Sequence, residues 1–193
     1  MDYDNLLKSL TGLGAGISAV AASWKWLPAL VVKIRARGMV AGLQRLHTVH
    51  NTMAGAVECG ATRTVIFGGH NSGGIPRVGS PFYVSALHCH VEGDRGSQIA
   101  DYQSINVDAA YIELLLQVVS KGFIRFDCSS AALPSMLLRF YRSEGVTDSL
   151  ICYLGTTDGN LIYVSFARFE GCFSGNEETK LLLIANQISQ LIK

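Results

Sequence analysis

The chain has 193 residues, of which 49% are apolar and only 16% are charged, and its net charge is +1. The apolar content excludes an intrinsically disordered protein, and the near-neutral charge lacks the strong basic excess typical of nucleic-acid-binding proteins. We therefore expect one main folded domain with a smaller appended segment, and no nucleic-acid partner.

The first expected element is an apolar helix over residues 10–32, which read LTGLGAGISAVAASWKWLPALVV. About 20 apolar residues suffice to cross a bilayer, and Trp24 and Trp26 suit a membrane interface. Lys25 opposes this interpretation, because a charge at the bilayer centre costs about 2.5 to 3.5 kcal/mol. Acidic residues precede the segment and basic ones follow it. The positive-inside rule therefore predicts a single-pass protein of the inner (cytoplasmic) membrane with its C-terminal domain in the cytoplasm. The alternative is a helix buried in an assembly, at a cytoplasmic or virion-associated location.

A stripe of residues with alternating spacings of four and three follows: Val32, Ala36, Met39, Leu43, Leu46, His50, Met53 and Val57. This is the a/d pattern of a coiled coil, and it predicts a homodimer or higher oligomer through residues 32–57. A helix that packs on its own sheet needs a similar stripe, so the second half can instead pack inward. We expect a hydrophobic helix and basic linker over residues 1–36 and a folded domain over residues 37–193.

Helices and strands alternate through the rest of the chain, with turn residues between them. We expect strands at residues 62–67, 81–90, 123–127, 147–154 and 161–168. We expect helices at residues 106–120 and 134–143, and a closing helix that begins near residue 174. Asp158-Gly159 is a strong hairpin signal, and Ser174 with Glu177 forms a capping-box pattern. Interleaved helices and hairpin-linked strands predict an α+β sandwich with a largely antiparallel sheet.

Three motifs in the C-terminal half carry a resemblance to a known family. They are YRSEGV (141–146) leading into SLICYL (149–154), DGNLI (158–162) and FSGNEE (173–178). From about residue 40 to its end, the chain resembles a GAF domain. The resemblance implies a GAF/PAS-like sandwich: a central, mostly antiparallel sheet flanked by helices and preceded by a long N-terminal helix. The chain lacks the Asn-Lys-x-Phe-Asp-Glu motif of cyclic-nucleotide-binding members and has Tyr163 where the family often has glycine. We therefore do not expect a cyclic-nucleotide site.

The loop at residues 68–80, GGHNSGGIPRVGS, has the most unusual composition in the chain. Glycines let a backbone approach a ligand closely, and successive N–H groups can form an anion site. The loop matches neither a Walker A nor a Rossmann pattern. We predict His70, Asn71, Ser72 and Arg77 as ligand-binding candidates, against the alternative of a surface loop made of turn residues.

His88 and His90 lie two residues apart on an expected strand, so they share one face and join the ligand-binding candidates. No spacing fixes a third ligand beside them, so we predict no metal site. No nucleophile elbow or paired-carboxylate pattern is visible, so we predict no catalytic residue, and nothing indicates a cofactor. The five cysteines are widely spaced without a CxxC motif, which favours free thiols.

These patterns favour a membrane-tethered, non-enzymatic GAF-like module that binds a small molecule or a partner protein and dimerises through its N-terminal helix. The overall layout also resembles small phage or prophage proteins. An alternative is therefore a phage structural or accessory protein that uses the fold as a scaffold. A second alternative is a small metal-dependent hydrolase built on His70, His88 and His90.

Overall fold

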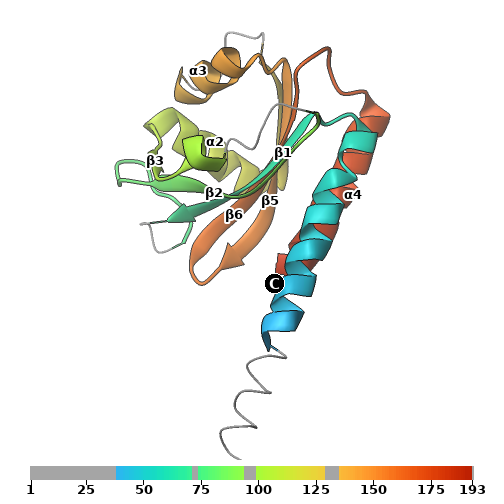
Figure 1. The fold of residues 1–193 in the computed structure, drawn as a ribbon. Helices are drawn as coiled ribbons and strands as arrows, with labels where there is room; N and C mark the ends of the chain where they lie inside the picture. Colours follow the sequence, from blue (N-terminus) through green and yellow to red (C-terminus); the bar gives the residue numbers. More distant parts are fainter. Residues whose placement is uncertain (1–37, 71–73, 94–98, 129–134, 193) are drawn as a thin grey trace, which may run out of the picture. The chain divides into compact units, whose positions relative to one another are not determined.

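The computed structural model describes residues 38–70, 74–93, 99–128 and 135–192 (Figure 1). The chain divides into two compact units, Met1–Leu46 and His47–Lys193. A helix over residues 38–54 comes first among the described elements. The elements after it are η1 (Val57–Cys59), β1 (Arg63–His70), β2 (Tyr83–Val91), η2 (Ile99–Tyr102), β3 (Ile105–Asn106), α2 (Ala109–Lys121), β4 (Phe123–Asp127), α3 (Ser135–Glu144), β5 (Asp148–Thr157), β6 (Asn160–Arg168) and α4 (Gly175–Ile192). The predicted domain boundary between residues 36 and 37 lies outside the described residues.

The strands of the described chain form one antiparallel sheet in the order β3-β2-β1-β6-β5-β4. With helices on both faces, this confirms the predicted α+β class. The hairpin between β5 and β6 also forms as predicted: Asp158 (φ 50°) and Gly159 (φ 75°) both adopt left-handed backbone conformations, as a tight hairpin turn requires. Neither η2 nor β3 was predicted, because segments this short contain no readable periodicity.

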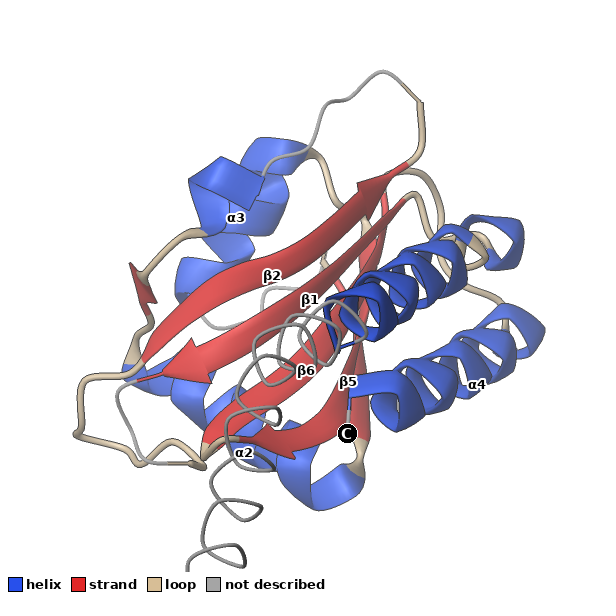
Figure 2. Ribbon diagram, turned by 60° about the horizontal axis from the view of Figure 1, so that its bottom comes forward, coloured by secondary structure: helices blue, strands red, loops and turns tan. Residues whose placement is uncertain are grey.

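Alternation along β1 divides the core into two layers. Val65 and Phe67 pack in one cluster together with residues of α2 and α3. Ile66, between them in sequence, packs in the other cluster together with α4 and the helical residues 47–54. Figure 2 shows α4 and the end of that helix on the same face of the sheet. The sheet therefore has a face covered by α2 and α3 and a face covered by α4.

The helical residues that begin the second unit pack inward in a register different from the predicted stripe. Val49, Met53 and Ala56 are buried in the cluster with α4. Leu46 and His50, which the stripe includes, are exposed. Of the residues in the second half of the predicted stripe, only Met53 therefore also belongs to the buried face of this segment.

The closing helix α4 begins with the predicted capping box. Ser174 N donates to Glu177 Oε2 at 2.7 Å, and Glu177 N donates to Ser174 Oγ at 3.3 Å. These bonds satisfy N–H groups that a helix start otherwise leaves without partners. Leu181 and Ile188, which lie seven residues apart on one face of α4, are fully buried.

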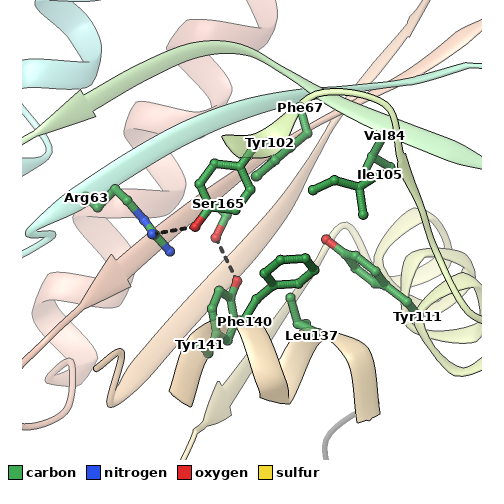
Figure 3. A pocket seen from close by; sticks show the side chains of 10 residues that line it. All are labelled: Arg63, Phe67, Val84, Tyr102, Ile105, Tyr111, Leu137, Phe140, Tyr141 and Ser165. Carbon is green, nitrogen blue, oxygen red and sulfur yellow. Dashed lines mark hydrogen bonds between the residues drawn. The ribbon is translucent and has the colours of Figure 1, made fainter. Parts of the chain in front are cut away.

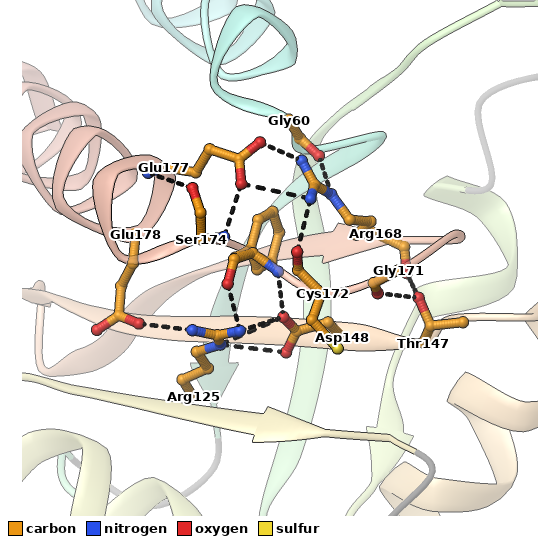
Figure 4. Close-up of polar contacts among 11 residues, drawn as sticks. Gly60, Arg125, Thr147, Asp148, Arg168, Gly171, Cys172, Ser174, Glu177 and Glu178 are labelled. Atoms are coloured by element: carbon orange, nitrogen blue, oxygen red, sulfur yellow. Dashed lines mark hydrogen bonds and ion pairs between the residues drawn. The ribbon is translucent and has the colours of Figure 1, made fainter.

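Charged side chains of the sheet hold the start of α4 and the loop before it (Figure 4). The buried carboxylate of Asp148 accepts from Arg125 Nη2 at 2.9 Å and from the backbone N of Phe173 at 2.6 Å. Arg168 Nη2 donates to Glu177 Oε1 at 2.6 Å, and Arg168 Nε donates to the carbonyl of Gly60 at 2.8 Å. The loop before α4 is therefore held by charge-assisted hydrogen bonds as well as by apolar packing.

The predicted single-pass membrane location needs correction. Within the described part of the chain, no helix combines the length and the apolar character needed to cross a bilayer. The longest described element, α4, buries only one face and carries Glu177 and Glu178 in its first turn. The apolar segment 10–32, on which the prediction was based, lies outside the described residues.

Candidate ligand-binding site

The predicted loop candidates are only partly described by the structure. His70 ends β1, its Nε2 lies 3.1 Å from Ser85 Oγ, and its ring stacks on Tyr83 with 5.9 Å between centroids. Arg77 is exposed. Asn71 and Ser72 lie outside the described residues. The contacts of His70 and Arg77 do not bring His70 and Arg77 together.

The two histidines of β2 share one face, as alternation predicts. His88 pairs in register with Ile66 and His90 with Thr64, which places both on the face covered by α4, while Cys89 packs against the opposite cluster. The ring of His90 meets His50 edge-on at 5.3 Å. Burial lowers the pKa of His88 and of His90, and nearby His50 lowers both further.

Among the described residues, no three or more His, Cys, Asp or Glu side chains are grouped so that they could hold a metal ion. His70 contacts Ser85 and Tyr83, whereas His90 contacts His50. The described residues therefore give no support to a hydrolase built on His70, His88 and His90.

A different site lies on the other face of the sheet, between the strands and helices α2 and α3 (Figure 3). Its described lining is largely aromatic and aliphatic: Arg63, Phe67, Val84, Tyr102, Ile105, Tyr111, Leu137, Phe140, Tyr141 and Ser165. We call it the aromatic pocket. It encloses about 380 Å³ including its mouth, but only about 20 Å³ admits the centre of a water-sized sphere. That is room for about one water molecule, so the structure shows the pocket nearly closed.

An ion pair stands at one end of the aromatic pocket. Arg63, only 3% exposed, donates from Nη1 to Glu144 Oε2 at 2.6 Å and to the hydroxyl of Tyr102 at 2.9 Å. Its guanidinium also lies 5.6 Å from the ring centroids of Tyr102 and Phe169. Burial raises the pKa of Glu144 above its ordinary value, although Arg63 opposes that shift. Arg63 thus joins the start of β1 to the end of α3 and to η2.

Hydroxyl groups supply the other polar contacts of the aromatic pocket. Tyr141 OH lies 3.0 Å from both Ser149 Oγ and Ser165 Oγ, and Tyr111 OH lies 3.0 Å from Tyr163 OH. Burial raises the pKa of all three tyrosines, so their hydroxyls stay neutral at physiological pH. The walls therefore offer neutral hydrogen-bonding groups beside one charged pair.

No sequence motif marked the aromatic pocket, but one signal for Arg63 was readable. Arg63 lies two residues before Val65 and four before Phe67, so alternation places its side chain on the same buried face. A buried arginine needs an anionic partner, and that requirement points to a polar feature inside an apolar layer.

Comparisons with known proteins define the fold class. No family model matches the chain, and no curated protein matches it. Solved structures do match. The photoproduct state of GAF3 from Slr1393 of Synechocystis aligns with a TM-score of 0.57 at 13% identity, over 77% of this chain and 92% of that one. The GAF domain/HD domain protein from Geobacter sulfurreducens aligns with a TM-score of 0.52 at 13% identity, over 77% and 89%. A phycocyanobilin-bound GAF domain from a cyanobacterial phytochrome aligns with a TM-score of 0.52 at 17% identity, over 81% and 90%. The chain therefore has a GAF-like fold.

Proposed function

We propose that this chain is a non-enzymatic binding module that holds a small aromatic molecule in the aromatic pocket. The observation that carries the proposal is the lining itself: five of its ten described residues are aromatic, and a few polar groups stand at defined positions. Binding sites for small molecules have this composition, with an apolar wall and a small number of polar groups that fix orientation. One structural neighbour with this fold is described as phycocyanobilin-bound, which supports a binding role.

The polar groups of the aromatic pocket favour binding over catalysis. Its described lining contains neither a histidine nor a cysteine, and Ser165 Oγ contacts Tyr141 OH and Ser149 Oγ rather than a base. A serine nucleophile needs an adjacent general base for activation. Tyrosines with raised pKa values do not serve as bases near neutral pH.

The test compares two substitutions on β2 that add the same ring to opposite faces of the sheet. Val84 lines the aromatic pocket, whereas Leu87 is exposed on the other face above Gly68. Calorimetric titration with phenol and with indole should show saturable binding to the unmodified chain and to Leu87→Phe. Val84→Phe should lose it, because the added ring fills the pocket. Absence of binding to the unmodified chain, or equal binding to Val84→Phe, would overturn the proposal.

A scaffold role, including one in a phage particle, is the second candidate. The observation in its favour is the nearly closed state of the aromatic pocket, with room for about one water molecule. A scaffold needs a solid core and no ligand. Failure of every aromatic probe to bind therefore favours the scaffold over the binding module.

We also propose that the module pairs with a second copy through the helix over residues 38–54. Met39, Leu43 and Leu46 are 65%, 59% and 47% exposed, and their spacing of four and three residues is that of one coiled-coil seam. The described part of this helix has no acidic residue, so a second copy would meet it through apolar contacts rather than through ion pairs.

A further inference from the structure

Arg63 and Glu144 differ in how firmly the fold holds them. Arg63 begins the central strand β1 and is 3% exposed, and its guanidinium lies 5.6 Å from the ring centroids of Tyr102 and Phe169. Glu144 is the last residue of α3, directly before Gly145, whose φ of 77° ends the helix. Its side chain is 13% exposed and contacts Arg63, which lines the pocket. The cation is therefore fixed inside, whereas the carboxylate reaches it from a helix end.

The charge balance of the aromatic pocket restricts what can enter. A buried guanidinium needs an anion beside it, and Glu144 supplies that anion. If Glu144 turns outward, a ligand carboxylate can take its place on Arg63 without leaving a charge unpaired. The planar guanidinium suits such an exchange, because its parallel N–H groups match the two oxygens of a carboxylate.

The nearly closed state links this exchange to helix α3. Leu137, Phe140 and Tyr141 of α3 form one wall, and about 20 Å³ is left for a water-sized sphere. A ligand larger than water therefore needs α3 to move away from the sheet. The contact between Glu144 and Arg63 ties the end of α3 to β1, so its replacement by a ligand would release that end.

The rest of the lining selects an aromatic body for the ligand. The ring of Phe67 stacks on Tyr163 at 5.2 Å and meets Tyr102 edge-on at 5.8 Å, and Tyr102 contacts Phe140 at 6.2 Å. Aromatic rings prefer such stacked and edge-to-face neighbours. Figure 3 shows the rings of Phe67, Tyr102 and Phe140 between Arg63 and Tyr111. A single ring with a carboxylate therefore matches the aromatic lining and the charge of Arg63 once α3 has moved away.

We propose that the aromatic pocket takes a small aromatic carboxylate, and that Glu144 is an internal competitor that occupies the ligand's position on Arg63 in the closed form. This assigns a ligand class to the same pocket and so rests on the proposed function. Carboxylate binding would displace Glu144 and free the end of α3, which gives the module two states that a partner can distinguish.

The experiment uses the full chain and a pair of probes of nearly equal shape, benzoate and benzamide. Calorimetric titrations are made with the unmodified chain, with Glu144→Gln and with Glu113→Gln. Glu113 is an exposed residue of α2, so its replacement removes the same charge from another pocket helix without touching Arg63. Glu144→Gln should bind benzoate about tenfold more tightly than the unmodified chain, because the competing carboxylate is gone. Benzamide affinity should change by less than about twofold, and Glu113→Gln should leave both probes unchanged.

Each other outcome has a defined meaning. Equal gains for benzoate and benzamide in Glu144→Gln, or a loss of benzoate affinity, would overturn the competitor role. If phenol and indole bind but benzoate does not, the ligand class is wrong and the proposed function stands. If no probe binds, the proposed function itself fails. Where Glu144→Gln does not fold, Glu144→Asp serves instead, because its shorter side chain weakens the contact and keeps the charge. It should then raise benzoate affinity above that of the unmodified chain, and an unchanged affinity would overturn the proposal.

Discussion

Asp148 shows how a single buried charge organises its surroundings. Its side chain is 1% exposed and holds Arg125 on one side and the backbone of Phe173 on the other. The arginine also pairs with Glu178 at 3.0 Å, so the same guanidinium contacts both β5 and α4. Sequence alone marked none of these partners, because they are separated by 23 to 53 residues along the chain.

Replacement of Asp148 by Asn should lower the free energy of unfolding by about 2 to 3 kcal/mol, since charge-assisted hydrogen bonds are lost from a buried position. Urea denaturation followed by far-UV circular dichroism measures the change. Asp158→Asn is the matched control: Asp158 is exposed in the β5–β6 turn, and asparagine tolerates its positive φ. A similar effect of the two substitutions would show that the Asp148 contacts add little to stability.

A side chain added at Gly60 would collide with the guanidinium of Arg168. The φ of Gly60 is 85°, and a Cβ there would lie 1.7 Å from Nη2 of Arg168. Gly122 has nearly the same φ of 86° but nothing within 4 Å of an added Cβ. Gly122→Ala should therefore cost only the backbone strain, about 1 kcal/mol. Gly60→Ala should cost about 1 to 3 kcal/mol more, because Arg168 must leave Gly60 and Glu177. Thermal and urea unfolding of the two variants give the difference, and equal losses would contradict this account.

At the residue scale, sequence patterns predicted those contacts whose two residues lie close together in the chain. Ser174 and Glu177 lie three residues apart, and their reciprocal bonds form as predicted. Arg63 and Glu144 are 81 residues apart, and no spacing rule joins them. Local sequence patterns therefore could not predict the Arg63–Glu144 ion pair. Alternation along β1 places only Arg63 itself, on the buried face of the strand.

At the scale of elements, the helix over residues 38–54 shows why a periodic stripe does not identify its partner. The predicted stripe and the observed buried face overlap only at Met53, while Val49 and Ala56 complete the inward face. A helix needs a similar apolar stripe whether it pairs in a coiled coil or packs on a sheet. Longer elements such as β6 and α4 formed where predicted because each combines a clear period with a turn or cap signal at its start.

The contact between this helix and β2 should make stability depend on pH. His88 and His90 have lowered pKa values from burial and from His50, and Glu92 partly opposes the shift at His90. The unfolded chain therefore binds more protons than the folded chain as pH falls below about 6.5. The free energy of unfolding should decrease from that pH down through the lowered pKa values. Urea titrations at a series of pH values measure the slope.

His90→Gln should flatten this pH dependence, because it removes one of the shifted groups. His47→Gln should not, since His47 lies on the same helix but contacts Asn51 instead of β2. Glu144 acts in the opposite direction: its raised pKa makes stability fall as pH rises above about 4.5, so the comparison is made between variants at each pH. An unchanged slope in His90→Gln would refute the histidine contribution.

On the scale of the whole molecule, the two faces of the sheet are packed differently. The face with α4 is closed by large buried side chains and by ion pairs at its rim. The opposite face contains the aromatic pocket, whose described lining runs from Arg63 to Ser165. Because the lining is assembled from many elements, the sequence predicted the sandwich but not the location of a cavity within it. The candidates in the glycine-rich loop, by contrast, are contiguous in the sequence, which is why they could be predicted without knowledge of the fold.

The association state is a prediction at this same scale. Native mass spectrometry of the full chain should show a dimer, and Leu43→Glu should shift it to monomer, because it places a charge within the exposed apolar seam. Gln44→Glu adds the same charge one position away from the seam and should leave the dimer intact. A monomer at micromolar concentration for the unmodified chain would argue against pairing through this helix.

Binding of a small aromatic molecule in the aromatic pocket can be tested by mapping the binding site. Phenol is titrated into isotope-labelled chain, and backbone amide shifts are followed by NMR. Saturable shifts should be concentrated at pocket residues such as Phe67, Val84 and Phe140. Shifts concentrated instead at Arg77, His88 and His90, or no saturable shift anywhere, would contradict binding in the aromatic pocket.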